Sequence, residues 1–327
     1  MEKWTNNMNK VTLVIITIVI SWGALGGALP VRANNDLTAN TLKVTPLRTD
    51  VVSDPGGTVS VKVIVTNPSN QDIEVRPIQN DFISGDENGN PAIILDENEF
   101  APTRSLKRFL KPIGNVTIPA NKSQTIEVAI DVPAEAKPGG YFGAIRFAPV
   151  DPDSGGQVNM SVSIASLILL TVNGDVPEKL DLTNFDIKHK DSLVGEFVIN
   201  PTSLAVSSRF RNDSNIQLAP FGKISVQKGE VVVYETDFNN KDPKDMILPD
   251  SARRWGTSLE GLDSFGKYTV KATFTYGSKN QTIEVEHSFW LITLPALIGG
   301  IVGAMVVLGM AISIVLVISR RNRRISF

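Results

Sequence analysis

Cysteine is absent from the 327 residues of the chain. A disulfide framework, a thiol nucleophile and a cysteine-based zinc site are therefore excluded. A secreted eukaryotic region of this length usually carries disulfides. The absence therefore favours a bacterial or archaeal surface protein that is stabilised by burial of its core alone.

Histidine is almost as scarce, with only His189 and His287 in the chain. His189 lies among charged neighbours and is expected on a solvated turn, and His287 lies close to the C-terminal apolar run. The sequence also has no Gly-x-Ser-x-Gly elbow, P-loop or His-Glu-x-x-His motif. We expect no catalytic residue, no cofactor and no metal ligand, and we interpret the protein as a non-enzyme.

Positive charge is scarce in the middle of the chain. The formal net charge is −2, from 32 basic and 34 acidic residues. Several of the basic residues lie in or beside the two terminal segments, so the middle is acidic. Nucleic-acid binding needs a basic surface, and we therefore expect no nucleic-acid partner.

The N-terminus has the order of a secretory signal peptide. Lys3 and Lys10 precede an apolar run at 11–20, and small residues follow. This basic, apolar, small-residue order predicts a signal peptide over 1–33, with cleavage between Ala33 and Asn34. An uncleaved N-terminal anchor is the alternative.

The C-terminus has the pattern of a membrane span. Residues 291–318 contain no charge, and about 20 apolar helical residues cross the ~30 Å hydrocarbon layer. Trp290 stands at one edge, where indole rings favour the interface. We predict a transmembrane helix over 289–319 and a cytoplasmic tail over 320–327. The tail is placed inside by its arginines, Arg320, Arg321, Arg323 and Arg324.

Two glycines of this span, Gly299 and Gly303, form a Gly-x-x-x-Gly step. Small residues four apart let two membrane helices approach closely. Homo-association through the helix is one hypothesis, and ordinary glycine usage in membrane helices is the other.

Between the two ends, apolar and polar residues alternate. Val61, Val63 and Val65 alternate with Lys, Ile and Thr at 62, 64 and 66, and a similar pattern recurs over 126–132 and 268–276. A period of two predicts strands with one buried face, and turn-forming runs at 55–57, 67–70 and 138–140 separate them. We predict two β-sandwiches, at 34–175 and 176–288. A related turn, Asn67-Pro-Ser-Asn in one and Asn212-Asp-Ser-Asn in the other, suggests an internal repeat.

Three further segments of the sequence are candidate sites. Carboxylates crowd around a Gly89 turn, which predicts a hairpin with an acidic rim; a calcium site and a glycosidase pair are the alternatives. The run Arg253-Arg254-Trp255 is either a binding patch or a core tryptophan with basic neighbours. Tyr141 and Phe142 are expected in the core. The carboxylates are Asp81, Asp86, Glu87, Asp96, Glu97 and Glu99.

Several segments resemble the WxL-interacting proteins, a family of Gram-positive surface proteins. They are Leu-Lys-Val-Thr-Pro at 42–46, Pro-Gly-Gly-Thr at 55–58, Ile-Pro-Ala-Asn-Lys-Ser at 118–123 and Tyr-Phe-Gly-Ala-Ile at 141–145. The resemblance implies a signal peptide, two immunoglobulin-like domains, one membrane span and a short basic tail. It also implies a first domain that binds peptidoglycan and a second that binds other surface or host proteins, although the stretch between Pro46 and Pro55 lacks the family's aromatic-aspartate segment.

The sequence therefore predicts an all-β fold of two tandem immunoglobulin-like β-sandwiches followed by a single C-terminal transmembrane α-helix. The function expected is that of a membrane-anchored binding or adhesion protein at the cell surface, with its sandwiches outside the cell. Its partner is expected to be a cell-wall polymer or a surface protein, and no residue of the ligand-binding surface is identified. The alternative is an accessory subunit that assembles into an envelope complex through its transmembrane helix.

Overall fold

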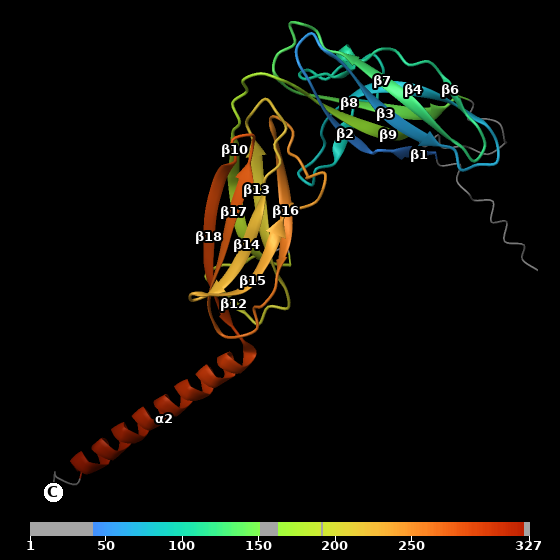
Figure 1. Ribbon diagram of the computed structural model, residues 1–327. Coiled ribbons are helices and arrows are strands. Elements are labelled where there is room, and N and C mark those ends of the chain that lie inside the picture. The colour runs from blue at the N-terminus through green and yellow to red at the C-terminus, as the bar shows by residue number, and fades with distance from the viewer. Residues whose placement is uncertain (1–41, 151–162, 191, 324–327) are drawn as a thin grey trace, which may run out of the picture. The chain divides into compact units, whose positions relative to one another are not determined.

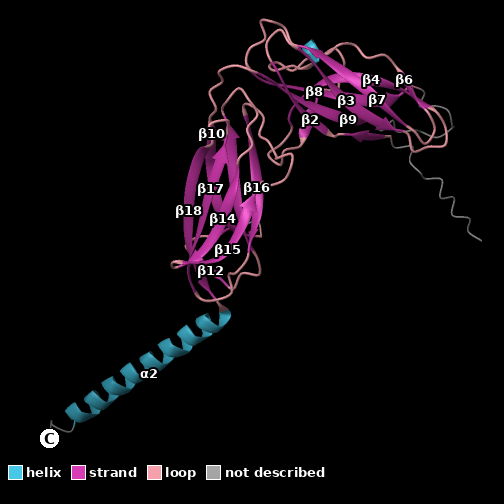
Figure 2. Cartoon of the chain, viewed as in Figure 1, coloured by secondary structure: helices cyan, strands magenta, loops and turns pink. Residues whose placement is uncertain are grey.

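The computed structural model describes residues 42–150, 163–190 and 192–323. The chain divides into Met1–Thr41 and Leu42–Phe327, and the second unit holds every described element. Figure 1 labels these elements and Figure 2 shows that strands dominate, with one long helix at the C-terminal end. The predicted fold class is confirmed: two tandem β-sandwiches precede a helix.

The first sandwich has a small sheet facing a larger one. The small sheet has the order β1-β3-β7, with β1 (Lys43–Thr45), β3 (Thr58–Thr66) and β7 (Ser123–Asp131) all antiparallel. In the larger sheet β2 pairs in parallel with β9, and the other pairs are antiparallel. Its strands are β2 (Arg48–Ser53), β9 (Ile164–Val172), β8 (Gly139–Pro149), β4 (Ile73–Ser84) and β5 (Pro91–Ile93), with β6 (Val116–Ile118) beside β4. A short 3₁₀ helix, η1, covers Lys107–Phe109.

The core of the first sandwich follows the predicted alternation. Val61, Val63 and Val65 of β3 are buried, and so are the alternate residues of β7 from Ile126 onward. They form one cluster with residues of the larger sheet such as Phe147. Burial of these aliphatic side chains supplies the main stabilisation of a sandwich without disulfides.

The second sandwich has four strands against five. One sheet has the order β11-β10-β13-β16, and the other has the order β12-β18-β17-β14-β15. The first comprises β11 (Ser192–Leu193), β10 (Leu180–His189), β13 (Leu204–Asn212) and β16 (Ser251–Leu259). The second comprises β12 (Phe197–Ile199), β18 (Gln281–Ile292), β17 (Gly266–Tyr276), β14 (Phe221–Lys228) and β15 (Val231–Phe238).

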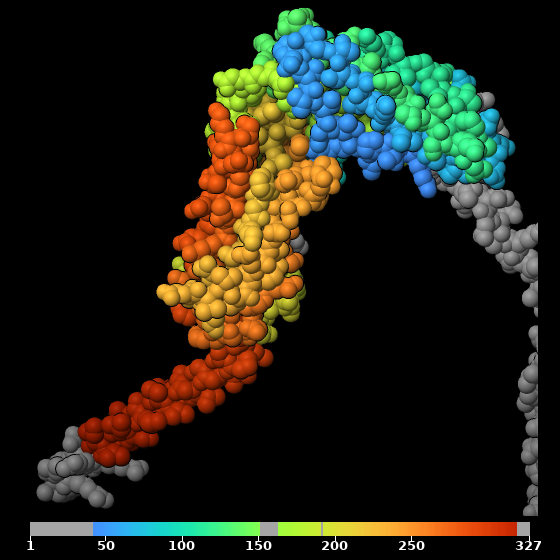
Figure 3. All heavy atoms as spheres, in the orientation of Figure 1, coloured from blue at the N-terminus to red at the C-terminus, as the bar shows by residue number. Residues whose placement is uncertain are grey.

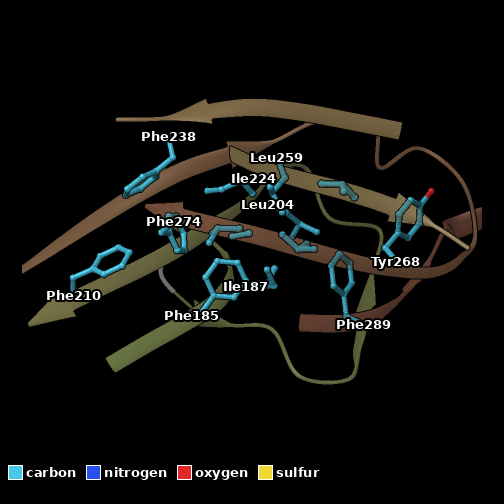
Figure 4. Packing of buried hydrophobic residues seen from close by; sticks show 14 of the residues in the cluster. Phe185, Ile187, Leu204, Phe210, Ile224, Phe238, Leu259, Tyr268, Phe274 and Phe289 are labelled. Atoms are coloured by element: carbon cyan, nitrogen blue, oxygen red, sulfur yellow. The ribbon is translucent and has the colours of Figure 1, made fainter. Parts of the chain in front are cut away.

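Aromatic rings fill much of the core between these two sheets (Figure 4). The ring centroid of Phe274 lies 5.0 Å from that of Phe210 and 4.8 Å from that of Phe238, and both pairs have edge-to-face geometry. Edge-to-face pairs contribute about 0.5–1.5 kcal/mol beyond their buried area. The predicted core face of β17, which includes Tyr268 and Phe274, is buried throughout.

The same asparagine turn occurs once in each sandwich. The Asn67 side chain donates to the Gln71 and Ile118 carbonyls at 2.7 and 3.0 Å, and its oxygen accepts from the Ser69 backbone N–H at 2.9 Å. The Asn212 side chain makes the equivalent bonds, donating to the Ile216 and Ile247 carbonyls at 2.8 and 2.9 Å and accepting from the backbone N–H of Ser214 at 3.0 Å. Both asparagines are fully buried, so each ties its own turn to a distant segment.

The C-terminal helix, α2, spans Leu294–Arg323. Within it, Leu294–Ile318 is long and apolar enough to cross a membrane, with a mean hydropathy of 2.9 and none of its most apolar stretch buried. Figure 3 shows the atoms of this helix exposed along its length. The helix starts later than the expected 289, because Phe289 and Leu291 belong to β18 and are each only 1% exposed. The first apolar residues of the predicted span therefore complete the core of the second sandwich.

Candidate functional site

A groove of ≈ 450 Å³ lies within the unit 42–327, where segments far apart in sequence meet. Its volume is within the range of ligand-binding pockets. We call it the arginine groove, because it is lined by Arg104, Arg209 and Arg211 beside the apolar side chains of Phe82, Phe142 and Leu248. The β4–β5 hairpin, the two strands β8 and β13, and the segment 248–252, which leads into β16, contribute the remaining walls.

The β4–β5 hairpin forms one wall because Asp86 closes its turn. The Asp86 carboxylate accepts from the backbone N–H groups of Asn88 and Asn90 at 2.9 and 3.1 Å, and Gly89 adopts a φ of 89° that favours glycine. Hydrogen bonds from Asn90 hold the pKa of Asp86 below its ordinary value. The predicted hairpin turn with acidic residues is present at this position.

The turn presents Glu87 to two arginines. The Glu87 carboxylate lies 2.6 Å from Nη2 of Arg209 and 3.2 Å from Nη2 of Arg254, and the Glu87 carbonyl accepts the Arg254 backbone N–H at 2.7 Å. The hydrogen bond from Arg209 lowers the pKa of Glu87, and partial desolvation opposes that shift. This cluster fixes the hairpin against β13 and β16.

This ion-pair cluster predicts a pH-dependent contribution to stability. Because the folded-state pKa of Glu87 is lowered, its stabilisation is complete above the unfolded pKa of about 4.3 and is lost as the pH falls through the folded pKa. Glu87→Gln should lower the free energy of unfolding at pH 6 by at most about 1 kcal/mol, since the carboxylate is partly exposed. Denaturant titrations at pH 6 and pH 3 should show the difference at the higher pH only. Glu284→Gln on β18 is the control, and an equal loss at both pH values would contradict the assignment.

Two arginines of the groove have guanidinium N–H groups that are not committed to an acid. Arg104 has a φ of 58°, donates to the Asn215 side chain, and has a buried Nε–H without a partner among the described residues. Burial lowers the pKa of Arg104. Arg211 uses Nε to bind Asp213 at 2.7 Å. Guanidinium groups bind carboxylate and phosphate in a planar, bidentate manner, so the groove can hold an acidic group above an apolar floor.

The six carboxylates singled out in the sequence do not converge on one point. Asp81 is buried and accepts from the backbone N–H groups of Ala101 and Lys107, both at 2.9 Å. Glu97 pairs with Arg76 at 2.8 Å. Across the described residues, no group of three His, Cys, Asp or Glu side chains could hold a metal ion. Asp81 therefore organises the loop around it, and Asp86 and Glu87 are the members that line the groove.

The contacts of the run 253–255 are those of a tryptophan packed against the core with basic neighbours, and a binding role for it stays a hypothesis. Trp255 packs on Phe210 and Phe238 with centroid distances of 5.7 and 5.4 Å, so it is a core residue. Arg253 lies over the Trp255 ring at 5.0 Å and pairs with Asp245 at 3.1 Å. The other aromatic pair considered, at 141–142, also packs in the interior, with Phe142 buried.

The remaining predicted residues lie elsewhere. His189 is near Thr202, 3.3 Å from its hydroxyl. Gly299 and Gly303 lie one helical turn apart on α2 with open space around them. Ala33, Asn34 and Arg324 lie outside the described residues, and Arg320, Arg321 and Arg323 fall in the last turns of α2. The cleavage site, the tail orientation and helix pairing stay predictions.

Sequence reasoning missed the arginines of the groove, Arg104, Arg209 and Arg211. They come from a loop and a strand that are separated by about a hundred positions, and only the fold brings them together. One signal was present in the sequence: Arg209 and Arg211 are two apart on an alternating strand, so their side chains share a face.

No protein-family model matches the chain, and no curated protein matches it. Among solved structures, it is similar to a chain of the chaperone–tip adhesin complex of CFA/I fimbriae, with 14% identity, a TM-score of 0.39, and coverage of 75% of this chain and 98% of that one. The class 5 fimbriae chaperone CfaA matches with 12% identity, a TM-score of 0.39, and coverage of 76% and 99%. The E. coli chaperone DraB matches with 14% identity, a TM-score of 0.35, and coverage of 76% and 96%. Similarities of this size assign neither a partner nor an activity.

Proposed function

We propose that the chain is a membrane-anchored, non-enzymatic binding protein of the cell surface, whose sandwiches lie outside the cell and whose basic tail lies in the cytoplasm. The observation that carries the proposal is α2, because a 25-residue apolar stretch whose most apolar part no described residue covers suits a lipid environment. The Thr293 residue alone separates it from β18. The folded sandwiches are thus held at the surface of the bilayer.

The partner we propose is a cell-wall polymer or a surface protein with acidic groups, bound in the arginine groove. Support comes from the Nη donors of Arg211, which pair with no described residue, from the positive charge of Arg104, and from the apolar residues that line the groove with them. An acidic group would replace water on these donors, and the apolar floor would contact the ligand backbone. Pairing through Gly299 and Gly303 remains a hypothesis for an accessory role.

A pull-down with the full chain in detergent tests this proposal. Cell-wall fractions and surface-protein extracts should retain the wild-type chain, and Arg211→Glu should weaken retention by at least about tenfold, or 1.4 kcal/mol. Arg76→Glu is a matched control, since Arg76 and Arg211 are 51% and 48% exposed and each pairs with one carboxylate.

Retention by the wall fraction alone selects a polymer, and retention by the extract alone selects a protein. No retention by either fraction, or equal loss in both charge-reversal variants, would contradict binding in the groove.

A further inference from the structure

The exposed apolar side chains of the second sandwich gather at the end that carries the helix. The strand registers define that end: Leu291 in β18 pairs with Gly266 at the start of β17, and Phe197 in β12 pairs with Trp290. Lys228 pairs with both Tyr268 and Val231, which places the β14–β15 turn there as well. We call the exposed side chains of this end the apolar collar, and they are Leu193, Phe197, Ile199, Val231, Phe265 and Trp290.

The members of the collar are between 39% and 67% exposed. Among the described residues of 176–292, the only other large apolar side chains with comparable exposure are Val232 and Val233, which follow Val231 along β15. The opposite end, at the β17–β18 hairpin, carries the polar residues 278–280 instead. A soluble domain scatters its exposed apolar residues, whereas a one-sided cluster marks an interaction surface.

Chain continuity identifies what this surface meets. Ile292, which pairs with Ile199, is two residues from the first helical residue, Leu294, a distance of no more than about 7 Å along the chain. The polar interface on each side of the hydrocarbon layer is about 5–8 Å thick. If Leu294 begins the span, the collar therefore lies at the depth of the lipid headgroups.

The chemistry of the collar suits that depth. Phe265 and Trp290 form a tilted aromatic pair with centroids 5.9 Å apart, and Lys267 lies opposite Trp290 in the sheet. Indole rings concentrate at membrane interfaces, and lysine side chains extend past apolar surface toward water or phosphate. Neighbouring acidic residues such as Glu196 and Glu230 keep the region from being a basic patch, so apolar contact is the main attraction.

We propose that the apolar collar is a membrane-contact surface that seats the second sandwich on the lipid headgroup region of the outer leaflet. The collar then holds the sandwich against the bilayer in addition to the single covalent connection through Thr293. This inference rests on the membrane anchoring proposed above, and it adds that the sandwich itself touches lipid.

Depth-dependent quenching in nanodiscs tests the collar. Because the chain has no cysteine, a single introduced cysteine carries the only thiol-directed fluorophore. The labelled variants are Phe197→Cys and Phe265→Cys in the collar, Lys279→Cys at the opposite end of the sandwich, and Met305→Cys in α2. Each full-length variant is placed as a single copy in a phosphatidylcholine nanodisc that contains a nitroxide lipid, with the nitroxide either on the headgroup or deep in the acyl chain.

We expect the headgroup nitroxide to quench the two collar labels at least threefold more than the Lys279 label, and the deep nitroxide to quench the Met305 label. Collar labels quenched no more than the Lys279 label, with the Met305 label still quenched, would overturn the collar and leave the anchor intact. An unquenched Met305 label would instead overturn the anchor and the proposed function. A protein partner cannot imitate the signal, since each disc holds one chain and lipid.

A second measurement separates contact from proximity. With the label on Lys267→Cys, the Phe197→Ser/Phe265→Ser double substitution should reduce headgroup quenching at least twofold. The matched control is Leu47→Ser/Val52→Ser, which removes two comparably exposed apolar residues of the first sandwich. Equal quenching in the two doubly substituted proteins would contradict a collar that holds the sandwich down.

Discussion

Asn212→Asp should destabilise the second sandwich by about 3–5 kcal/mol, a cost typical of an uncompensated buried charge. In the native turn, the Asn212 amide donates to the Ile216 and Ile247 carbonyls at 2.8 and 2.9 Å. A carboxylate keeps the Ser214 donors on one oxygen, but it turns its second oxygen, with negative charge, toward two carbonyl oxygens in a fully buried site. Since a domain has only about 5–15 kcal/mol of stability, one oxygen in place of one NH₂ removes a large share of it.

Thermal unfolding followed by circular dichroism measures this effect. The unfolding temperature of the second sandwich should fall by more than about 10 °C, at roughly 4 °C per kcal/mol for a domain of this size. Asn280→Asp is the control, because Asn280 is an exposed turn residue with a φ of 51° that aspartate also tolerates. A matching loss in the control, or none in Asn212→Asp, would contradict the role assigned to the buried amide.

The repeated turn makes the effect separable between the two sandwiches. Asn67 makes the equivalent bonds in the first sandwich, where its amide donates to the Gln71 and Ile118 carbonyls. Asn67→Asp should therefore lower the unfolding temperature of the first sandwich and leave that of the second unchanged.

The sequence predicted the similarity between the two turns, but not the burial of the asparagines, because the second carbonyl that each one binds comes from a distant segment.

The strands were predictable because their signal is local. Side chains two positions apart on a strand point to the same face of the sheet. The alternation of neighbouring residues was therefore enough to predict that Val61, Val63 and Val65 are buried together. The arginine groove was not predictable in this way. Arg104 and Arg211 stand on separate segments, and their proximity depends on the packing of the whole unit rather than on a period in the sequence.

The start of the helix was misjudged for a different physical reason. Hydropathy counts apolar residues without distinguishing a protein core from lipid, and both surroundings favour Phe289 and Leu291. In the structure these two residues alternate with exposed neighbours and complete β18. The run that looked like one membrane segment is therefore the end of a strand followed by a helix.

A chain stopped after Thr293 should fold and leave the membrane, whereas a chain stopped after Ser288 should not fold stably. The shorter chain loses Phe289 and Leu291, each only 1% exposed in the core of the second sandwich. Large-to-small changes at such positions cost about 2–5 kcal/mol each, and the last residues of β18 also hold β12 in the sheet. The combined loss is comparable to the whole stability of a domain.

Expression of both chains with their natural N-terminus measures folding and orientation together. The 1–293 chain should be released outside the membrane as a protease-resistant protein, and the 1–288 chain should be degraded or insoluble, although they differ by only five residues. A 1–293 chain with Trp290→Ser is the matched control: Trp290 is exposed, so this chain should behave like the unaltered 1–293 chain.

Equal stability of the 1–288 and 1–293 chains would contradict the boundary between strand and helix. Folded 1–293 protein retained in the cytoplasm would contradict the outward orientation, because without α2 only the N-terminal signal directs the sandwiches across the bilayer.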